Sequence, residues 1–235
     1  YKYFGNSVIV SSISLISILF LSSLLAYGIT RFNSRFGNLI FLITLGGMAL
    51  SEQVALVPLY KILQATHLYN TYWAVILPYV AFRIPFTVFL MRAYFMCIPK
   101  ELEEAAVIDG CNDFQIFGKI IFPLSKAITV VMTLYYGVGR WNSYFVEMIY
   151  LKDRNKFPLQ LFLREILTKS TFAKTAMADG MSFSAEQMMA LIKQADTANM
   201  IKYGVIVLSA LPMLIIYPFL QKYFEQGVMI GSVKG

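Results

Sequence analysis

The sequence predicts an all-α protein that crosses a membrane several times, and two observations lead to this prediction. Hydrophobic residues make up 58% of the 235 residues and charged residues only 14%, which gives a mean hydropathy of +0.63. Soluble domains carry about 25% charged residues, so this chain has too few to cover a soluble surface of its size. In addition, long apolar stretches recur along the chain, each long enough for a helix that spans a bilayer.

Other classes of protein are disfavoured by the same counts. The net charge of +7 could suggest nucleic acid, but in a chain this apolar, basic residues more often lie at membrane interfaces. Cys97 and Cys111 are too few, and too poorly spaced, for a disulfide scaffold or a zinc site. His67 is the single histidine. We therefore expect no metal site and no catalytic residue.

The first membrane span is expected at Ser7–Ile29, 23 residues without a charge, which would extend about 34 Å as a helix. Arg31 and Arg35 follow at once and favour a cytoplasmic end there. Four further apolar stretches are expected to span, which makes five in this chain: Gly37–Tyr60, Thr71–Tyr94, Ala127–Leu151 and Met200–Leu220. All five belong to a single transmembrane domain, residues 1–235.

The polar segment 99–123 is expected to form a helix, a turn and a second helix on the cytoplasmic side. Three glutamates occupy its first turn, where the helix dipole favours anions: Glu101, Glu103 and Glu104. Gly110 stands where a left-handed C-cap belongs, and Asn112 or Asp113 can cap the next helix. That helix should present one apolar face and end at Pro123; the face consists of Phe114, Phe117, Gly118 and Ile121.

The second polar segment, 152–199, is expected outside the membrane. Its amphipathic run Pro158–Leu167 places four apolar residues on one face, suited to folding back over the mouth of the bundle: Leu159, Phe162, Leu163 and Ile166. Ser184 and Gln187 form a capping-box pattern that should open another helix, which reaches Ala195. The apolar stripe expected on that helix consists of Met188, Met189 and Ile192.

One motif inside segment 99–123 is informative about function. Glu104-Ala105-Ala106, three residues, Gly110, nine residues and then Ile120-Ile121-Phe122-Pro123 closely resembles the EAA signature of binding-protein-dependent ABC importer permeases, with Phe122 where leucine is usual. The resemblance implies a helical bundle of the type I importer kind in a bacterial plasma membrane. It also implies that the segment couples to an ATPase subunit; the residues concerned are Glu103, Glu104, Ala105, Ala106, Asp109, Gly110 and Pro123.

The resemblance extends over essentially the whole chain and is closest to the carbohydrate branch, in particular to the smaller permease subunits of maltose-type importers. The matching features are Asn6-Ser7, Ala26-Tyr27, Pro58-Leu59-Tyr60, Trp141-Asn142 and the ending Gly231–Gly235. Such subunits usually have six spans, so we expect one more N-terminal helix in the full protein. The implied partners are a second homologous permease, two ATP-binding subunits and an extracellular solute-binding protein. ATP and magnesium would bind at the partner subunits and no cofactor at this chain.

Six residues are candidates for the substrate path. Glu52 and Arg83 are charges within apolar stretches, where a charge is costly unless it is paired or hydrated; they could line the path, pair with each other or serve packing. Four residues in the fourth span combine aromatic rings, which stack on sugars, with amide and carboxylate groups, which bind hydroxyls: Trp141, Asn142, Tyr144 and Glu147. The alternative role for these four residues is an aromatic anchor at the membrane interface.

Two other functions remain as rivals at this point. An ion-coupled secondary transporter could use Glu52, Arg83 and Glu147 as relay groups, although the EAA motif argues against it. An importer of another solute, such as a polyamine, phosphate or peptide, is disfavoured only by the carbohydrate-like features. No nucleotide-binding loop of the form G-x4-G-K-[ST] occurs in the sequence, so we do not expect the chain itself to hydrolyse ATP.

Overall fold

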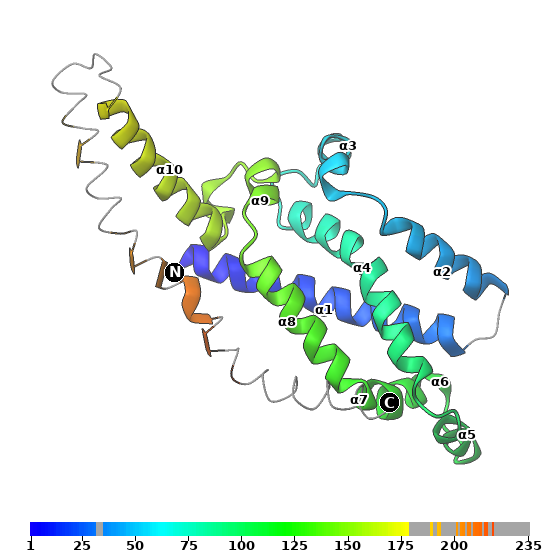
Figure 1. Ribbon diagram of the computed structural model, residues 1–235. Helices are drawn as coiled ribbons and strands as arrows, with labels where there is room; N and C mark the ends of the chain where they lie inside the picture. The colour runs from blue at the N-terminus through cyan, green and yellow to red at the C-terminus, as the bar shows by residue number, and fades with distance from the viewer. Residues whose placement is uncertain are drawn as a thin grey trace.

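The computed structural model describes residues 1–31 and 35–178, together with scattered positions between 189 and 218. Across these residues the protein is built from helices alone, which confirms the predicted all-α class (Figure 1). The elements are α1 (Lys2–Arg31), α2 (Arg35–Gly47), α3 (Glu52–Ala65), α4 (Trp73–Met96), α5 (Glu101–Ile108), α6 (Asp113–Ile116), the π-helix η1 (Phe117–Ile121), α7 (Phe122–Leu124), α8 (Lys126–Trp141), α9 (Phe145–Tyr150), the 3₁₀-helix η2 (Arg154–Lys156) and α10 (Leu159–Ala178).

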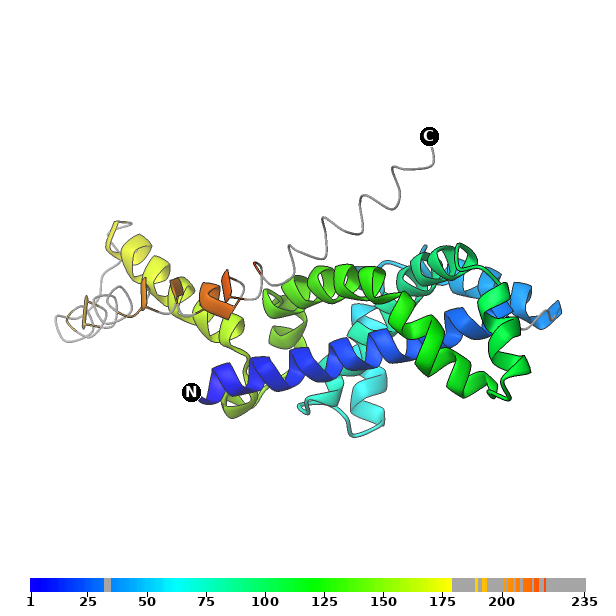
Figure 2. The same cartoon turned by 90° about the horizontal axis from the view of Figure 1, so that it is seen from below.

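Helices α1 and α4 pack side by side and run in the same direction. At one end the Tyr72 hydroxyl donates to Asn6 Oδ1 at 2.9 Å, and at the other Arg31 donates to the carbonyl of Phe95 at 3.1 Å. The face of α1 buried in the bundle is rich in small serine residues, which let helices approach closely in a membrane: Ser7, Ser11, Ser14, Ser22 and Ser23. Helix α8 lies against this pair and returns in the opposite direction (Figures 1 and 2).

The core divides along the bundle into two clusters. The first contains Val10, Val75, Tyr79 and Tyr136 near the start of α1, and the second contains Ala26, Val88, Phe95 and Ile121 near its end. The end of the bundle at the second cluster carries α5 to α7 and is called the α5 end below. The opposite end carries α9, η2 and the start of α10 and is called the α10 end (Figure 1).

The α10 end is closed by contacts between residues far apart in the chain. Asn6 Nδ2 donates to the carbonyls of Asn155 at 2.7 Å and Phe157 at 3.0 Å. Ser7 Oγ accepts a bond from the Leu159 amide at 2.8 Å. The first turns of α1 therefore hold the start of α10 in place through hydrogen bonds.

Two of the predicted spans are broken. The stretch predicted as the second span is a helix pair, Phe36–Gly47 and Glu52–Ala65, bent by 99°. Close packing fixes the end of its first half, since a Cβ on Gly47 would lie 3.2 Å from Pro85 Cγ. The stretch predicted as the fourth span divides into α8 and α9, and α8 is itself bent by 73° from the preceding helical run, Asp113–Leu124.

The predicted number of spans stays a prediction. Helices α1 and α4 are each long and apolar enough to cross a membrane, and up to four spans result if each bent pair counts as one. These helices match the first and third predicted spans. The predicted fifth span, 200–220, lies outside the described residues except at scattered positions, and the capping box and stripe expected at 184–195 lie outside them except at Met189, Ile192 and Lys193.

Candidate functional site

Segment 99–123 forms the predicted helix, turn and helix at the α5 end (Figure 1). Helix α5 begins with the three expected glutamates. Gly110 has a φ of +80°, the left-handed conformation in which glycine avoids the strain of a side chain. Asn112 caps α6 by accepting from the Gln115 amide at 2.9 Å, and the Gln115 side chain accepts from the Asn112 amide at 3.0 Å. The local chemistry predicted for this turn is confirmed, with Asn112 as the cap.

One ion pair fastens this segment to the bundle. Arg31, at the end of α1, lies 2.7 Å from Glu103 of α5, and their side chains are 8% and 15% exposed. The same guanidinium donates to the carbonyls of Phe95 and Ile98, at 3.1 and 3.3 Å. Burial raises the pKa of the Glu103 carboxyl above its ordinary value, and the nearby Arg31 opposes that shift. Arg31 thus joins the ends of α1 and α4 to α5.

The side of the segment that faces the bundle is apolar and buried. Ala106, Ile116, Phe117 and Ile121 pack in the second core cluster with residues of α1 and α4. Ala106 therefore lies against the bundle, whereas its neighbour Ala105 is exposed.

The segment also exposes large apolar side chains. Leu102 is 44% exposed, Val107 58%, Ile108 86% and Phe114 81%. Five of the expected coupling residues are exposed as well: Glu104, Ala105, Asp109, Gly110 and Pro123. We call the surface of Leu102, Val107, Ile108 and Phe114 the coupling face. An exposed apolar patch of this kind indicates an interaction site.

The expected apolar face of the second helix is corrected by the structure. Phe117 and Ile121 are buried, but Phe114 and Gly118 are exposed. The cause is the π-helical turn Phe117–Ile121. A π-turn holds more residues than an α-turn, so it rotates Ile121 away from the side on which Phe114 lies.

The charged candidates for the substrate path form two ion pairs. Arg83 Nη2 lies 3.2 Å from Glu52 Oε2, with side chains that are 38% and 21% exposed. Glu147 pairs with Arg140 at 2.6 Å, and both of these side chains are 1% exposed. Ser143 donates to the second oxygen of Glu147 at 2.9 Å. Glu147 is thus enclosed in the protein, whereas Glu52 and Arg83 remain partly accessible.

A tyrosine that the sequence analysis missed connects the two pairs. The guanidinium groups of Arg83 and Arg140 both lie over the ring of Tyr79, at 5.0 and 4.8 Å from its centroid. Its hydroxyl donates to the Tyr136 carbonyl at 3.0 Å. Arg140 was missed too, although it carries the signal that singled out Arg83, a charge within an apolar stretch.

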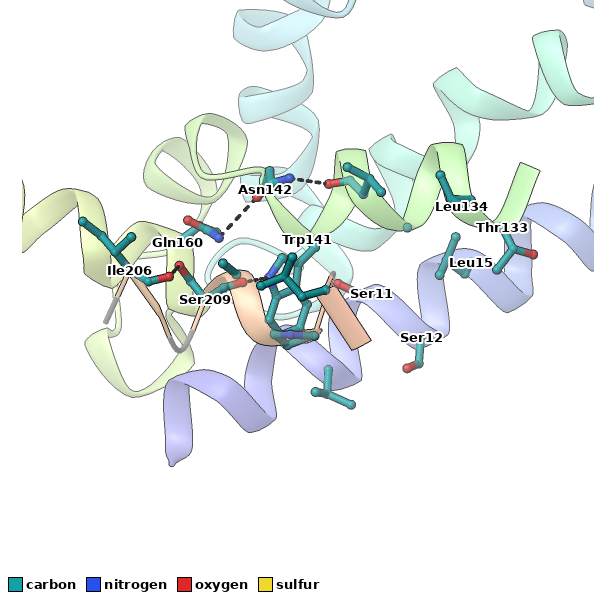
Figure 3. A pocket seen from close by; sticks show the side chains of 16 residues that line it. Ser11, Ser12, Leu15, Thr133, Leu134, Trp141, Asn142, Gln160, Ile206 and Ser209 are labelled. Atoms are coloured by element: carbon teal, nitrogen blue, oxygen red, sulfur yellow. Dashed lines mark hydrogen bonds between the residues drawn. The ribbon is translucent and has the colours of Figure 1, made fainter. Parts of the chain in front are cut away.

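The aromatic and amide candidates divide between two places. Trp141 and Asn142 line a groove of ≈ 810 Å³ between α1, α8 and a few described residues near the C-terminal end: Ile206, Ser209, Ala210, Pro212 and Leu214 (Figure 3). Trp141 Nε1 donates to the Ser209 carbonyl at 2.8 Å, and Gln160 of α10 donates to Asn142 Oδ1 at 3.4 Å. Tyr144 lies elsewhere, with the Arg164 guanidinium 4.5 Å from its ring centroid.

The groove has a mostly apolar wall with a few polar groups. Besides the amides of Asn142 and Gln160, hydroxyl groups come from Ser11, Ser12, Thr133 and Ser209 (Figure 3). Neither Glu52, Arg83, Tyr144 nor Glu147 lines this groove, whose lining includes no charged residue among those that the structure describes. Gln160 lines it without having been a candidate, because its position at the start of α10 depends on long-range contacts with α1.

Comparisons with known proteins agree with this arrangement. The family model described as "Binding-protein-dependent transport system inner membrane component" matches residues 18–154. A probable ABC transporter permease protein of Bacillus subtilis, YurM, is 39% identical over all of this chain and 70% of its own length. A B. subtilis polygalacturonan/rhamnogalacturonan transport system permease protein, YtcP, is 37% identical over all of this chain and 77% of its own length.

A solved structure supports the same assignment. The crystal structure of a bacterial ABC transporter involved in the import of the acidic polysaccharide alginate contains a chain that is 26% identical to this one. The match has a TM-score of 0.76 and covers 95% of this chain and 74% of that chain.

Proposed function

The chain belongs to the family of binding-protein-dependent transport system inner membrane components, and from that premise we propose that it forms part of the path for a sugar or oligosaccharide in an ATP-driven importer. It is a permease subunit of the bacterial inner membrane. The names of similar proteins mention polygalacturonan, rhamnogalacturonan and alginate, which favours a carbohydrate over a polyamine, phosphate or peptide.

The coupling face is the observation on which the proposal depends. Its four apolar residues are 44 to 86% exposed, while other residues of the same segment are buried in the bundle or fastened to it by the Arg31–Glu103 pair. A patch held this firmly on the bundle is suited to transmit the movement of a partner. We infer that segment 99–123 is cytoplasmic and that the partner is an ATP-binding subunit.

The remaining subunits follow from this role. ATP hydrolysis would be performed by two ATP-binding subunits, which would also bind the magnesium, so this chain would act without enzymatic activity or a cofactor of its own. A second homologous permease would complete the path. Segment 152–199, which begins at the α10 end, would lie outside the membrane and receive an extracellular solute-binding protein.

We infer that the groove contributes to the path at the α10 end. Trp141 lines the groove but is only 6% exposed, so the polar groups beside it would make the main contacts with a sugar. Asn142, Gln160 and the hydroxyl groups of Ser11, Ser12 and Thr133 can bond to sugar hydroxyls. A pocket with an apolar wall and a few polar groups suits a ligand that is bound weakly and released.

The test of the proposed function removes the apolar character of the coupling face. Ile108→Asp and Phe114→Asp place a charge on the docking surface, and each should weaken retention of the ATP-binding subunit by about tenfold or more, since burial of such a side chain contributes about 1.5–3 kcal/mol. Ile108→Leu and Phe114→Leu are the matched controls and should retain it. Co-purification of the subunits and ATP-dependent sugar uptake are measured together. Normal retention and normal uptake in both aspartate variants would show that the face has another role.

A further inference from the structure

Arg83 lies near the middle of α4, a helix long and apolar enough to span the membrane, yet its side chain is 38% exposed. A charged group in contact with lipid costs several kcal/mol, and intramembrane charges therefore face the protein interior or a water-filled cavity. An arginine that is both central and partly exposed is therefore expected to face a water-filled cavity or a partner subunit rather than lipid.

The guanidinium of Arg83 has unused hydrogen-bonding capacity. Within the described part of the chain it pairs with Glu52 at 3.2 Å, lies over the ring of Tyr79 at 5.0 Å and interacts with the Tyr79 hydroxyl. Arginine has five N–H donors in a fork that fits a carboxylate through two parallel bonds. Most of these donors are thus available to a ligand, while the stack on Tyr79 keeps the group in place.

Glu52 lies where its carboxylate would stay stabilised if the ion pair with Arg83 were broken. It is the first residue of α3 and follows directly on the 99° bend. The N-terminus of a helix carries partial positive charge, which stabilises a carboxylate in its first turn. If another anion displaces Glu52 from the Arg83 guanidinium, the partial positive charge of the helix N-terminus still stabilises the Glu52 carboxylate. Glu147 also lies in the first turn of a helix, α9, but its pair with Arg140 is closed to a ligand because both side chains are 1% exposed.

We propose that Arg83 is a specificity-determining residue that binds the carboxylate of an acidic, uronate-type sugar as it passes, by displacing Glu52. The inference rests on the proposed function, since it requires the chain to line a sugar path. A uronate carboxylate can accept two charge-assisted hydrogen bonds from Arg83. A neutral sugar of the same size offers only hydroxyl groups, which do not compete with Glu52 for the charge.

The experiment uses the complete importer in proteoliposomes with its solute-binding protein outside and ATP inside. The two probes are a galacturonate trisaccharide and its methyl ester, which differ in charge but hardly in size. Uptake of each is measured in the wild type, Arg83→Gln, Glu52→Gln and the control Lys61→Gln, an exposed lysine on the same helix as Glu52. Dividing the acid-to-ester ratio of a variant by that of the wild type cancels the preference of the binding protein.

Arg83→Gln should lower this normalised ratio by about tenfold, as expected for the loss of a charge-assisted pair. Glu52→Gln should instead lower the KM for the acid, because it removes the competitor for Arg83; a misfolded variant could not produce this gain. Lys61→Gln should leave the ratio at one. An unchanged ratio in Arg83→Gln, or a KM for the acid that does not fall in Glu52→Gln, would overturn the inference.

Failure of this inference can be told from failure of the proposed function. If the wild type imports the ester and other neutral oligosaccharides with ATP but discriminates against the acid as Arg83→Gln does, the specificity role is wrong and the sugar importer stands. If the wild type imports no oligosaccharide in an ATP-dependent manner, the proposed function fails and this inference fails with it.

Discussion

Arg140 and Glu147 form an ion pair of 2.6 Å across the break between α8 and α9, with both side chains 1% exposed. Arg140 Nε and Nη2 have no hydrogen-bond partner in the described part of the chain. The pair therefore concentrates two buried charges where the helix changes direction, and each charge depends on the other.

Removing one member of this pair should be more harmful than removing both. Glu147→Gln leaves a buried guanidinium without its counter-ion, and the expected loss of stability is about 3–5 kcal/mol, whereas the double variant Arg140→Met/Glu147→Leu should recover most of it. The measurement is the apparent melting temperature of the purified complex in detergent. Arg154→Met is the control, since its pair with Glu165 is partly exposed, at 56% and 26%, and should contribute about 1 kcal/mol. A double variant no more stable than Glu147→Gln would contradict the expectation.

The second prediction compares two glycines of segment 99–123. A Cβ on Gly110 or on Gly118 would meet nothing within 4 Å, and of the two only Gly110 has a positive φ. Gly110→Ala should therefore strain the turn by about 1–2 kcal/mol and reduce the sugar transported per ATP hydrolysed. Gly118→Ala, its control, should leave that ratio unchanged. Equal effects of the two substitutions would mean that the turn conformation is unimportant for coupling.

The orientation of the bundle can be tested with the two native thiols. Cys97 is exposed and Cys111 partly exposed, and both lie at the α5 end, which we assign to the cytoplasm. A membrane-impermeant thiol reagent should label them in inside-out vesicles and spare them in intact cells. Asn155→Cys, placed at the α10 end in a Cys97→Ser/Cys111→Ser background, should show the reverse. Labelling of the native thiols from outside the cell would show that the α5 end faces outward, opposite to our assignment.

The last prediction concerns segment 152–199. The first turns of α10 are anchored, with Leu159, Leu163 and Ile166 all less than 10% exposed and Phe162 stacked on Tyr3 at 4.3 Å. Deletion of residues 170–179 spares this anchor and should weaken the stimulation of ATP hydrolysis by the solute-binding protein, while basal hydrolysis stays nearly intact. A deletion variant that assembles and is fully stimulated would show that the segment has no docking role.

Local chemistry explains what the sequence predicted well. The turn at Gly110 and the cap at Asn112 depend on residues within a few positions of one another, so the pattern alone was sufficient. The amphipathic start of α10 was predicted for the same reason. The exposure of Phe114 was not, because the π-turn that follows it leaves no clear mark in an apolar sequence.

Long-range pairing explains what was missed. Glu147 was a candidate for binding sugar, but Arg140 lies across the helix break and encloses it. The groove was only half predicted because Gln160 and Ser209 reach it from distant parts of the chain. The only sequence feature that indicated the bend of 99° between α2 and α3 was Glu52, a charge in the middle of an apolar stretch.

The bonds of Asn6 have a consequence for biosynthesis. Its amide donates to the carbonyl of Asn155, which lies 149 residues later in the chain. At a synthesis rate of ~5–20 residues per second, the partner leaves the ribosome roughly 7–30 s after Asn6. Tyr72 can bond to Asn6 Oδ1 much earlier, but the contacts of the first helix with Asn155, Phe157 and Leu159 form only after all the helices up to α9 have been translated.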